Sequence, residues 1–283
     1  MPEWTIRLIE TADEMPAVEA LQRLVWPGSE TDVIPAHMLL AIVHNGGLAL
    51  GAYVDGEIVG LVFGFPGFYE TPDGPRLKHH SHILAVHPDW RDKGLGFAIK
   101  RAQWQLVRRQ GIDRITWTYD PLLSRNAHLN ITRLGTVCNT YRRAEYGKMR
   151  DGLNVGLPSD RFQVDWWVFS KRVERRLSRR SRPALTLDAY LTAETLLLEA
   201  RQERGPDLSP PEHIPPLTGS LLLVEIPDDF LALKQGDLAL GRDWRFYSRE
   251  VFEAAFAAGY LVTDFVHDEE RSFYVLTHGE STL

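Results

Sequence analysis

Apolar residues recur along the chain with two periods, that of a half-buried strand and that of an amphipathic helix. The first pattern predicts strands at residues 5–10, 48–54, 57–65, 78–86, 114–119, 136–141 and 161–168. The second predicts helices at residues 12–25, 36–44, 94–110 and 126–134. An Asp55-Gly56 pair between two of the strands is typical of a tight hairpin turn. This succession of strands and helices predicts an α+β fold.

The pattern changes after residue 170. Residues 170–180 read as a very basic helix, and residues 205–220 contain five prolines, typical of a linker or an extended crossover. A strand, helical residues and two closing strands follow, at residues 221–226, up to about 258, 260–266 and 272–277. We expect a first domain at 1–170, a basic helix and linker at 171–220, and a smaller α+β region at 221–283 that packs on the first domain. This tail loosely repeats the element order of residues 114–168, so a degenerate half-repeat is an open alternative.

Composition is that of an ordinary globular protein. Of 283 residues, 44% are hydrophobic and 25% charged, and the single cysteine, Cys138, excludes an intrachain disulfide. No apolar stretch is long enough to span a bilayer, so we expect an unprocessed cytoplasmic protein without a membrane partner.

Charge is distributed unevenly. Residues 1–182 carry 25 Lys and Arg against 20 Asp and Glu, whereas residues 183–283 carry 7 against 18. A basic half suits an anionic ligand, and an acidic half suits a cap or a partner surface. Compositional drift without a function is the alternative explanation.

The chemically most informative segment follows the strand at residues 78–86. It reads Arg91-Asp92-Lys93-Gly94-Leu95-Gly96 and leads into a predicted helix. Two glycines let a ligand approach the backbone, and the unpaired N–H groups of the first helical turn form an anion site. A dinucleotide-binding loop would need a third glycine where Ile99 stands, and the Gly-Lys-Ser/Thr ending of an NTPase loop is absent. The loop therefore suits a pyrophosphate.

The pattern Arg-x-x-Gly-x-Gly, preceded by a strand and Val-x-Pro, resembles the coenzyme A loop of the GNAT acyltransferase superfamily. The resemblance implies a mixed, mostly antiparallel sheet flanked by helices. It also implies an acyl-CoA co-substrate, with acetyl-CoA favoured, no metal, and direct attack on the thioester by a small-molecule primary amine. The coenzyme-contacting residues it implies are Leu84, Ala85, Val86, Arg91, Asp92, Lys93, Gly94, Leu95, Gly96 and Asn126.

The resemblance also suggests catalytic groups. The strand before the loop would part from its neighbour, and the backbone N–H of Leu84 would bind the developing oxyanion. Side chains on this strand alternate between faces, so we expect His80, His82 and Leu84 to share one face, with His80 as general base and His82 in reserve. The family often has a tyrosine that protonates the leaving thiolate of coenzyme A, but Arg133 stands at that position here. Tyr141, Tyr146 or solvent would then have to supply the proton.

Several alternatives stay open. The chain could be a non-catalytic acyl-CoA-binding module, or an acyltransferase for succinyl-CoA or another larger donor. The histidines near residue 80 could bind zinc, and the arginines after residue 170 could touch nucleic acid, but we favour neither. Cys138 reads as a buried structural thiol rather than a nucleophile. A homodimer is kept as an option.

Overall fold

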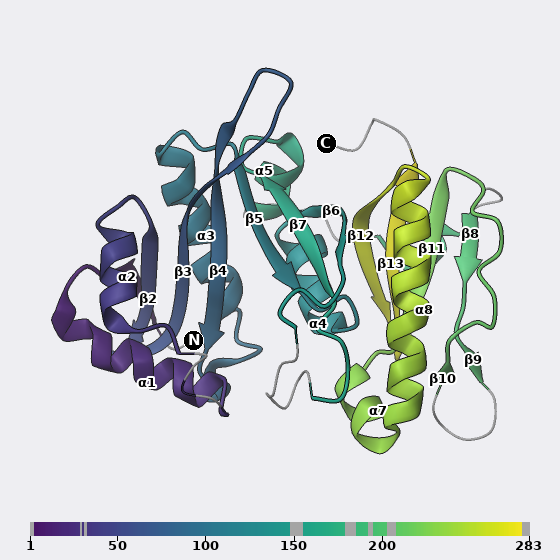
Figure 1. Cartoon of the computed structure of the whole chain (residues 1–283), viewed down its shortest axis with the longest axis horizontal. Coiled ribbons are helices and arrows are strands. Elements are labelled where there is room, and N and C mark those ends of the chain that lie inside the picture. Colours follow the sequence, from purple (N-terminus) through teal and green to yellow (C-terminus); the bar gives the residue numbers. More distant parts are fainter. Residues whose placement is uncertain are drawn as a thin grey trace. The chain divides into compact units, whose positions relative to one another are not determined.

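The computed structural model describes residues 3–28, 30, 33–147, 155–178, 185–191, 195–202 and 208–278. These residues group into two compact units, each described by itself (Figure 1). The first unit contains residues up to Trp117 together with Trp167–Phe169, and the second contains the other described residues. The units thus divide inside a strand at Thr118, whereas the sequence suggested boundaries at residues 170 and 220.

The first unit is built on five strands in sequence order. These are β1 (Thr5–Leu8), β2 (Leu48–Val54), β3 (Glu57–Tyr69), β4 (Arg76–Val86) and the start of β5 (Arg114–Tyr119). Neighbours run antiparallel except for β4 and β5, which are parallel. The predicted mixed, largely antiparallel sheet is therefore confirmed.

Helices cover both faces of this sheet. On one face, α1 (Met15–Val25) and α2 (Ala36–Val43) pack on a core that includes Leu61, Phe63 and Ala85. On the other face, α3 (Leu95–Arg109) packs through Leu95 and Ile99 on Val62 and the neighbouring strand residues. Adjacent residues of β3 thus enter opposite cores, as strand geometry requires. The described residues of this unit also include the short turns η1 (Ala12–Glu14) and η3 (Pro88–Trp90).

The second unit contains a sheet in the order β7-β6-β12-β13-β11-β8. Its strands are β6 (Val137–Arg142), β7 (Arg161–Trp167), β8 (Thr195–Leu198), β11 (Leu221–Ile226), β12 (Tyr260–Asp268) and β13 (Arg271–His278). Among the described strand pairs of this sheet, only β8 and β11 run parallel. A separate short ribbon joins β9 (Arg201–Gln202) and β10 (Leu208–Ser209). Part of the expected linker is therefore strand.

Helices of the second unit are α4 (Ser124–Ala127), α5 (Lys171–Leu177), α6 (Leu187–Tyr190), α7 (Phe230–Gly236) and α8 (Leu238–Ala257). A π-helical segment, η4 (His128–Arg133), continues α4. The predicted helix at 126–134 thus begins two residues earlier, at Ser124, and changes its hydrogen bonding halfway. Phe252 of α8 packs on Phe162 of β7, with ring centroids 4.7 Å apart.

The tail repeats an earlier order of elements, as the sequence suggested. The hairpin β6–β7 has its counterpart in β12–β13, and β6 and β12 are neighbours through Cys138 and Val262. Each hairpin shifts its register close to this contact. The structure therefore supports a degenerate half-repeat in the order of elements, without a second Gly-rich loop.

Candidate active site

The Gly-rich loop joins the end of β4 to the first turn of α3. Gly94 is the N-cap residue, and its φ of 82° lies in the left-handed region that glycine adopts without a steric penalty. The first helical hydrogen bond of α3 runs from Ala98 N to Gly94 O at 3.1 Å, so earlier N–H groups have no acceptor within the helix. The positive end of the helix dipole therefore faces the loop, as a phosphate site requires.

Charged side chains surround this helix start. Arg91, Asp92 and Lys93 are all exposed. The Arg91 Nε donates to the Val86 carbonyl at 3.4 Å, which links the loop to the end of β4. Asp92 has a φ of 60°. The N-cap of α3 is Gly94 rather than Asp92.

The strand before the loop parts from its parallel neighbour. Within the described pairs, β4 registers with β5 only at His79 and His80, whereas its pairing with β3 continues to Val86. This is the separation expected from the sequence. The last residues of β4 therefore present their β5-facing edge to a ligand instead of a strand.

A β-bulge interrupts β4 next to this separation. Phe63 of β3 pairs with Ile83, but the next residue, Gly64, pairs with Ser81. His82 is the extra residue and has no register partner on β3. Simple alternation of side chains consequently fails at this point.

The bulge separates the histidines from Leu84. The rings of His80 and His82 lie 5.2 and 5.9 Å from that of Phe65, which packs on the α1 and α2 face. Leu84 packs in the core beneath α3. The prediction that His80, His82 and Leu84 share one face is therefore wrong, because a bulge shifts the alternation by one residue.

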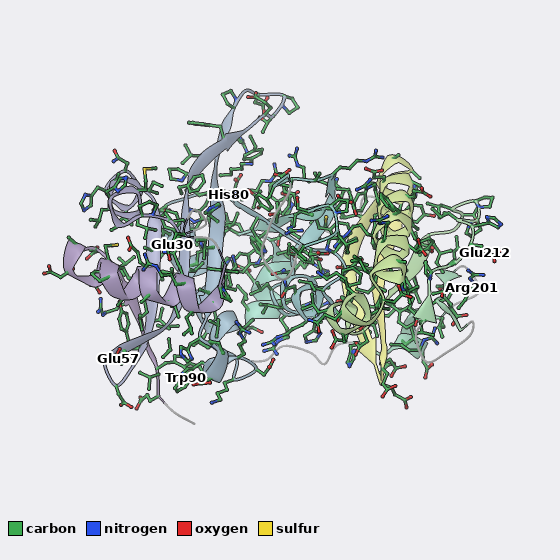
Figure 2. The ribbon with its side chains drawn as sticks, turned by 60° about the horizontal axis from the view of Figure 1, so that its bottom comes forward. Glu30, Glu57, His80, Trp90, Arg201 and Glu212 are labelled. Carbon is green, nitrogen blue, oxygen red and sulfur yellow. The ribbon has the colours of Figure 1, made fainter. Side chains whose placement is uncertain are left out.

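His80 is the better enclosed of the two histidines. Its Nδ1 lies 3.5 Å from the Thr116 hydroxyl of β5, while the His82 side chain is exposed. Burial, with additional effects from the charges of His82, Lys78 and Lys100, lowers the pKa of His80 to about 4. The imidazole is therefore neutral at pH 7 and can accept a proton. Figure 2 labels His80 on β4 and Trp90 beyond the end of that strand.

A buried polar network behind β4 was not foreseen from the sequence. The Lys100 Nζ of α3 donates to the Ser81 hydroxyl and to the Gln103 Oε1, both at 2.9 Å, and lies 3.5 Å from the ring centroid of Trp117. The Gln103 Nε2 contacts the His79 Nε2 at 3.2 Å. Burial lowers the pKa of Lys100 and lowers that of His79 to about 3. Polar residues inside the apolar stripe of α3 were the only sequence signal of this network.

The remaining predicted residues lie in the second unit. Asn126 is the third residue of α4, and Arg133 ends η4. The Tyr141 hydroxyl donates to the buried Asp160 carboxylate at 2.9 Å, and burial raises its pKa. The Tyr146 hydroxyl pairs with Thr118 at 2.6 Å. Either tyrosine would have to leave its present partner before it could serve as an acid.

Other candidate chemistry receives structural explanations. Cys138 is fully buried and its pKa is raised by burial, as expected of a structural thiol. Arg172 donates to the carbonyls of Gly135 and Thr263, and Arg176 pairs with Asp264 at 2.5 Å. Arg179, Arg180 and Arg182 lie outside the described residues. Within the part of the chain that is described, no cluster of His, Cys, Asp or Glu has metal-binding geometry, and no helix is long and apolar enough to cross a membrane.

Comparison with known families decides the class of the first domain. Residues 15–130 match the family model of the acetyltransferase (GNAT) family. These residues form a GNAT acetyltransferase domain. The domain includes the whole Gly-rich loop and extends beyond β5 to the α4–η4 helix, so it crosses the boundary between the two compact units.

Solved structures of GNAT proteins resemble part of the chain at low identity. The ribosomal-protein-S18-alanine N-acetyltransferase from Escherichia coli is 17% identical, with 59% of this chain and 94% of that chain covered and a TM-score of 0.44. A GNAT acetyltransferase from Streptococcus pneumoniae is 15% identical over 58% and 98% of the two chains, with a TM-score of 0.45. One from Elizabethkingia anophelis with acetyl-CoA bound is 13% identical over 59% and 99%, with a TM-score of 0.44. No curated protein matches the chain.

Proposed function

We propose that this protein transfers an acetyl group from acetyl-CoA to the primary amine of a small molecule. One observation carries the proposal: the Arg91–Gly96 loop stands at the start of α3, at the end of a strand that has parted from β5. The helix start suits the pyrophosphate, and the open edge of β4 suits the amide groups of the pantetheine arm. This combination supports the GNAT domain as a working acyltransferase domain.

The proposed reaction is a direct transfer in a ternary complex. The amine nitrogen attacks the thioester carbon, the carbonyl oxygen becomes an oxyanion near the backbone N–H of Leu84, and coenzyme A leaves as a thiolate. An alkylammonium resembles lysine, whose pKa is about 10.4, so a base must first remove a proton. His80 is our proposed base because it is neutral at pH 7, with His82 in reserve. Solvent is the proposed proton donor to the thiolate, since the Tyr141 hydroxyl is bound to Asp160.

The same tyrosine supports the rival that binds acyl-CoA without catalysis. Arg133 stands at the position of the usual acid, and the Tyr141 hydroxyl is bound to Asp160. Neither side chain is therefore an evident general acid that would exclude a non-catalytic module. The larger-donor alternative, such as succinyl-CoA, has lost support, because Arg172 and Arg176 of the basic helix already bind groups of their own unit. Assignment of the coenzyme contacts, a cytoplasmic location and a homodimer stay predictions.

Thiol release distinguishes these possibilities. The full chain is mixed with acetyl-CoA or succinyl-CoA and a library of primary amines, and free coenzyme A is followed with a thiol reagent. We expect amine-dependent release with acetyl-CoA that exceeds release with succinyl-CoA. Tight acetyl-CoA binding without release for any amine would favour the non-catalytic module, and faster release with succinyl-CoA would favour the larger donor.

A further inference from the structure

A cavity of about 400 Å³ lies within the second unit. Its walls come from the start of the α4–η4 helix, from β12 and from two residues between elements, Leu185 and Asp228. Small-molecule sites usually have volumes of about 300–1,000 Å³, so the cavity is large enough for a compact organic ligand. The proposed acyl transfer uses none of its residues.

One wall of the cavity carries a histidine that is oriented by a carboxylate. The His267 Nδ1 lies 3.0 Å from the Asp228 Oδ1, and the Ser272 hydroxyl donates to the same carboxylate oxygen at 2.8 Å. An imidazole held through Nδ1 turns its Nε2 away from the carboxylate. His267 can therefore accept a hydrogen bond from a ligand, or donate one when it is protonated.

The cavity is also lined by a second histidine, His128. Its Nδ1 is buried and has no hydrogen-bond partner among the described residues, so the Nε2 is the ring nitrogen that is left to meet a ligand. Burial lowers the pKa of His128, and Arg133, His267 and Arg176 lower it further, whereas Asp264 raises it. Burial and the nearby arginines therefore disfavour a proton on this ring.

A bound oxyanion would counteract the lowering of the His128 pKa, because its negative charge favours a proton on the ring. It would accept a hydrogen bond from His128 and be attracted by Arg125, which also lines the cavity. An ammonium group would be repelled by Arg125, and the Asp228 carboxylate is already engaged by His267 and Ser272. Phe265 and Leu185 add apolar walls for the remainder of the ligand.

We propose that this cavity binds a small organic oxyanion with an apolar body, held by His128 and Arg125 in the cavity that the His267–Asp228 pair also lines. A carboxylate and a phosphate monoester present the same chemistry to these groups. His128 and Arg125 lie in the GNAT domain, whereas Leu185, Asp228 and Phe265 lie outside it. The C-terminal region thereby gives the chain a ligand site that the family domain alone would lack.

Calorimetric titration of the full chain tests the proposal with four probes of similar size: phenylacetate, phenyl phosphate, phenethylamine and 2-phenylethanol. We expect an oxyanion probe to bind at least tenfold more tightly than the amine or the alcohol, and the stronger oxyanion identifies the head group. Binding should raise the pKa of His128 in a histidine NMR titration, because the ligand adds a negative charge beside the ring.

Matched variants locate the binding. His128→Gln should weaken the oxyanion at least tenfold, whereas His213→Gln, at a side chain 90% exposed, should not. Leu185→Asp adds a repelling carboxylate at the cavity, and Leu191→Asp is its control, since the two leucines are 55% and 45% exposed. Acetyl-CoA is titrated in parallel, because it also carries oxyanions.

Three results would overturn the proposal. One is tighter or equal binding of the amine or alcohol, or no binding of any probe. Another is equal affinity in His128→Gln and His213→Gln. The third is a tenfold loss of acetyl-CoA affinity in His128→Gln, which would assign the cavity to the coenzyme. None depends on acyl transfer, so failure here and failure of the proposed function are distinguishable.

Discussion

The imidazole of His80 sits between the Phe65 ring and the Thr116 hydroxyl, and this setting decides its protonation. Burial disfavours the imidazolium, so the pKa of His80 falls to about 4. A base with so low a pKa is always available at neutral pH but is weaker than an ordinary imidazole. His80 is therefore a weaker base than an ordinary histidine, but it is unprotonated throughout the neutral pH range.

Removal of this base should slow turnover and leave coenzyme binding intact. We expect His80→Ala to lower kcat by about 100-fold or more, as is typical of a lost general base, with an unchanged Kd for acetyl-CoA. His44→Ala, at an exposed histidine of the same unit, is the matched control. If His80→Ala and His82→Ala both keep full activity, the base does not lie on β4.

The pH profile offers an independent check of His80. A base must be unprotonated, so activity falls as pH decreases through its pKa. With a pKa of about 4, the acidic limb should appear near pH 4 rather than near the ordinary histidine value of about 6.5. Steady-state kinetics between pH 4 and 8 measures it, and an acidic limb that His82→Ala removes but His80→Ala does not would transfer the role to His82.

The sequence predicted the position of the Gly-rich loop at a helix start but not the orientation of the histidines. Gly94 and Gly96 could be identified because a strand, two glycines and a helix start are local features. The face taken by His80 could not, because a bulge at His82 depends on pairing with β3, which no local pattern encodes. The hydrogen bond between Tyr141 and Asp160 could not be predicted either, because the two residues are distant in sequence.

At the scale of elements, the hairpin of β3 and β4 determines where the histidines stand. Gly64 lies beside the bulge, and a Cβ added there would come within 2.3 Å of the His79 Nε2 and 2.5 Å of the His80 carbonyl. The second contact is with backbone and cannot be relieved by a rotamer change. The close approach of the two strands therefore requires glycine at this position.

Gly64→Ala should destabilise the protein by about 1–3 kcal/mol, as overpacking in a tight core typically does. Gly67→Ala on the same strand is the control, because its added Cβ would meet only the Lys78 side chain at 3.7 Å. Urea unfolding of the two variants measures the difference. Equal stability would show that the strands do not approach each other as described.

The buried His79 of this hairpin should make the free energy of unfolding depend on pH. Burial lowers the pKa of His79 to about 3, so between about 6.5 and 3 the unfolded chain binds a proton that the folded chain does not. The free energy of unfolding should thus decrease as pH falls below about 6.5, by up to about 1.4 kcal/mol per pH unit for this proton. His79→Gln should have a shallower slope between pH 6 and 4.5 in urea unfolding, and an identical slope would contradict the assignment.

Most elements were predictable because their apolar periods are strong. The strand at residues 114–119 was placed without error, and the long β3 was underestimated because its end continues beyond the buried stretch. The π-helical turns of η4 were missed, since no propensity distinguishes them from an α-helix. The β8 strand was taken for linker because its pairing with β11 is remote in sequence.

At the scale of the molecule, the tail is an integral part of the second unit. Phe162 packs on Phe252 and Tyr274, and the Tyr274 hydroxyl donates to the Pro121 carbonyl at 2.8 Å. Arg245 pairs with Asp120 at 2.5 Å, and both side chains are buried. The boundary suggested at residue 170 followed the change of sequence pattern there, whereas the compact units follow these contacts.

A fragment of residues 1–182 should therefore be insoluble or strongly destabilised, because it removes the partners of Phe162 and leaves Asp120 without Arg245. Expression of the fragment beside the full chain, followed by thermal unfolding, tests this. A soluble fragment with full activity and unchanged acceptor preference would show that the tail is an independent appendage.

Acetyl-CoA binding to the loop variant Gly96→Val tests the central claim most directly. A branched side chain at Gly96, in the first turn of α3, would occupy the space proposed for the pyrophosphate. Gly67→Val on β3 is the matched control. In calorimetric titration of folded protein, we predict loss of detectable acetyl-CoA binding in Gly96→Val and unchanged affinity in Gly67→Val. Undiminished affinity in Gly96→Val would contradict the assignment of the coenzyme to this loop.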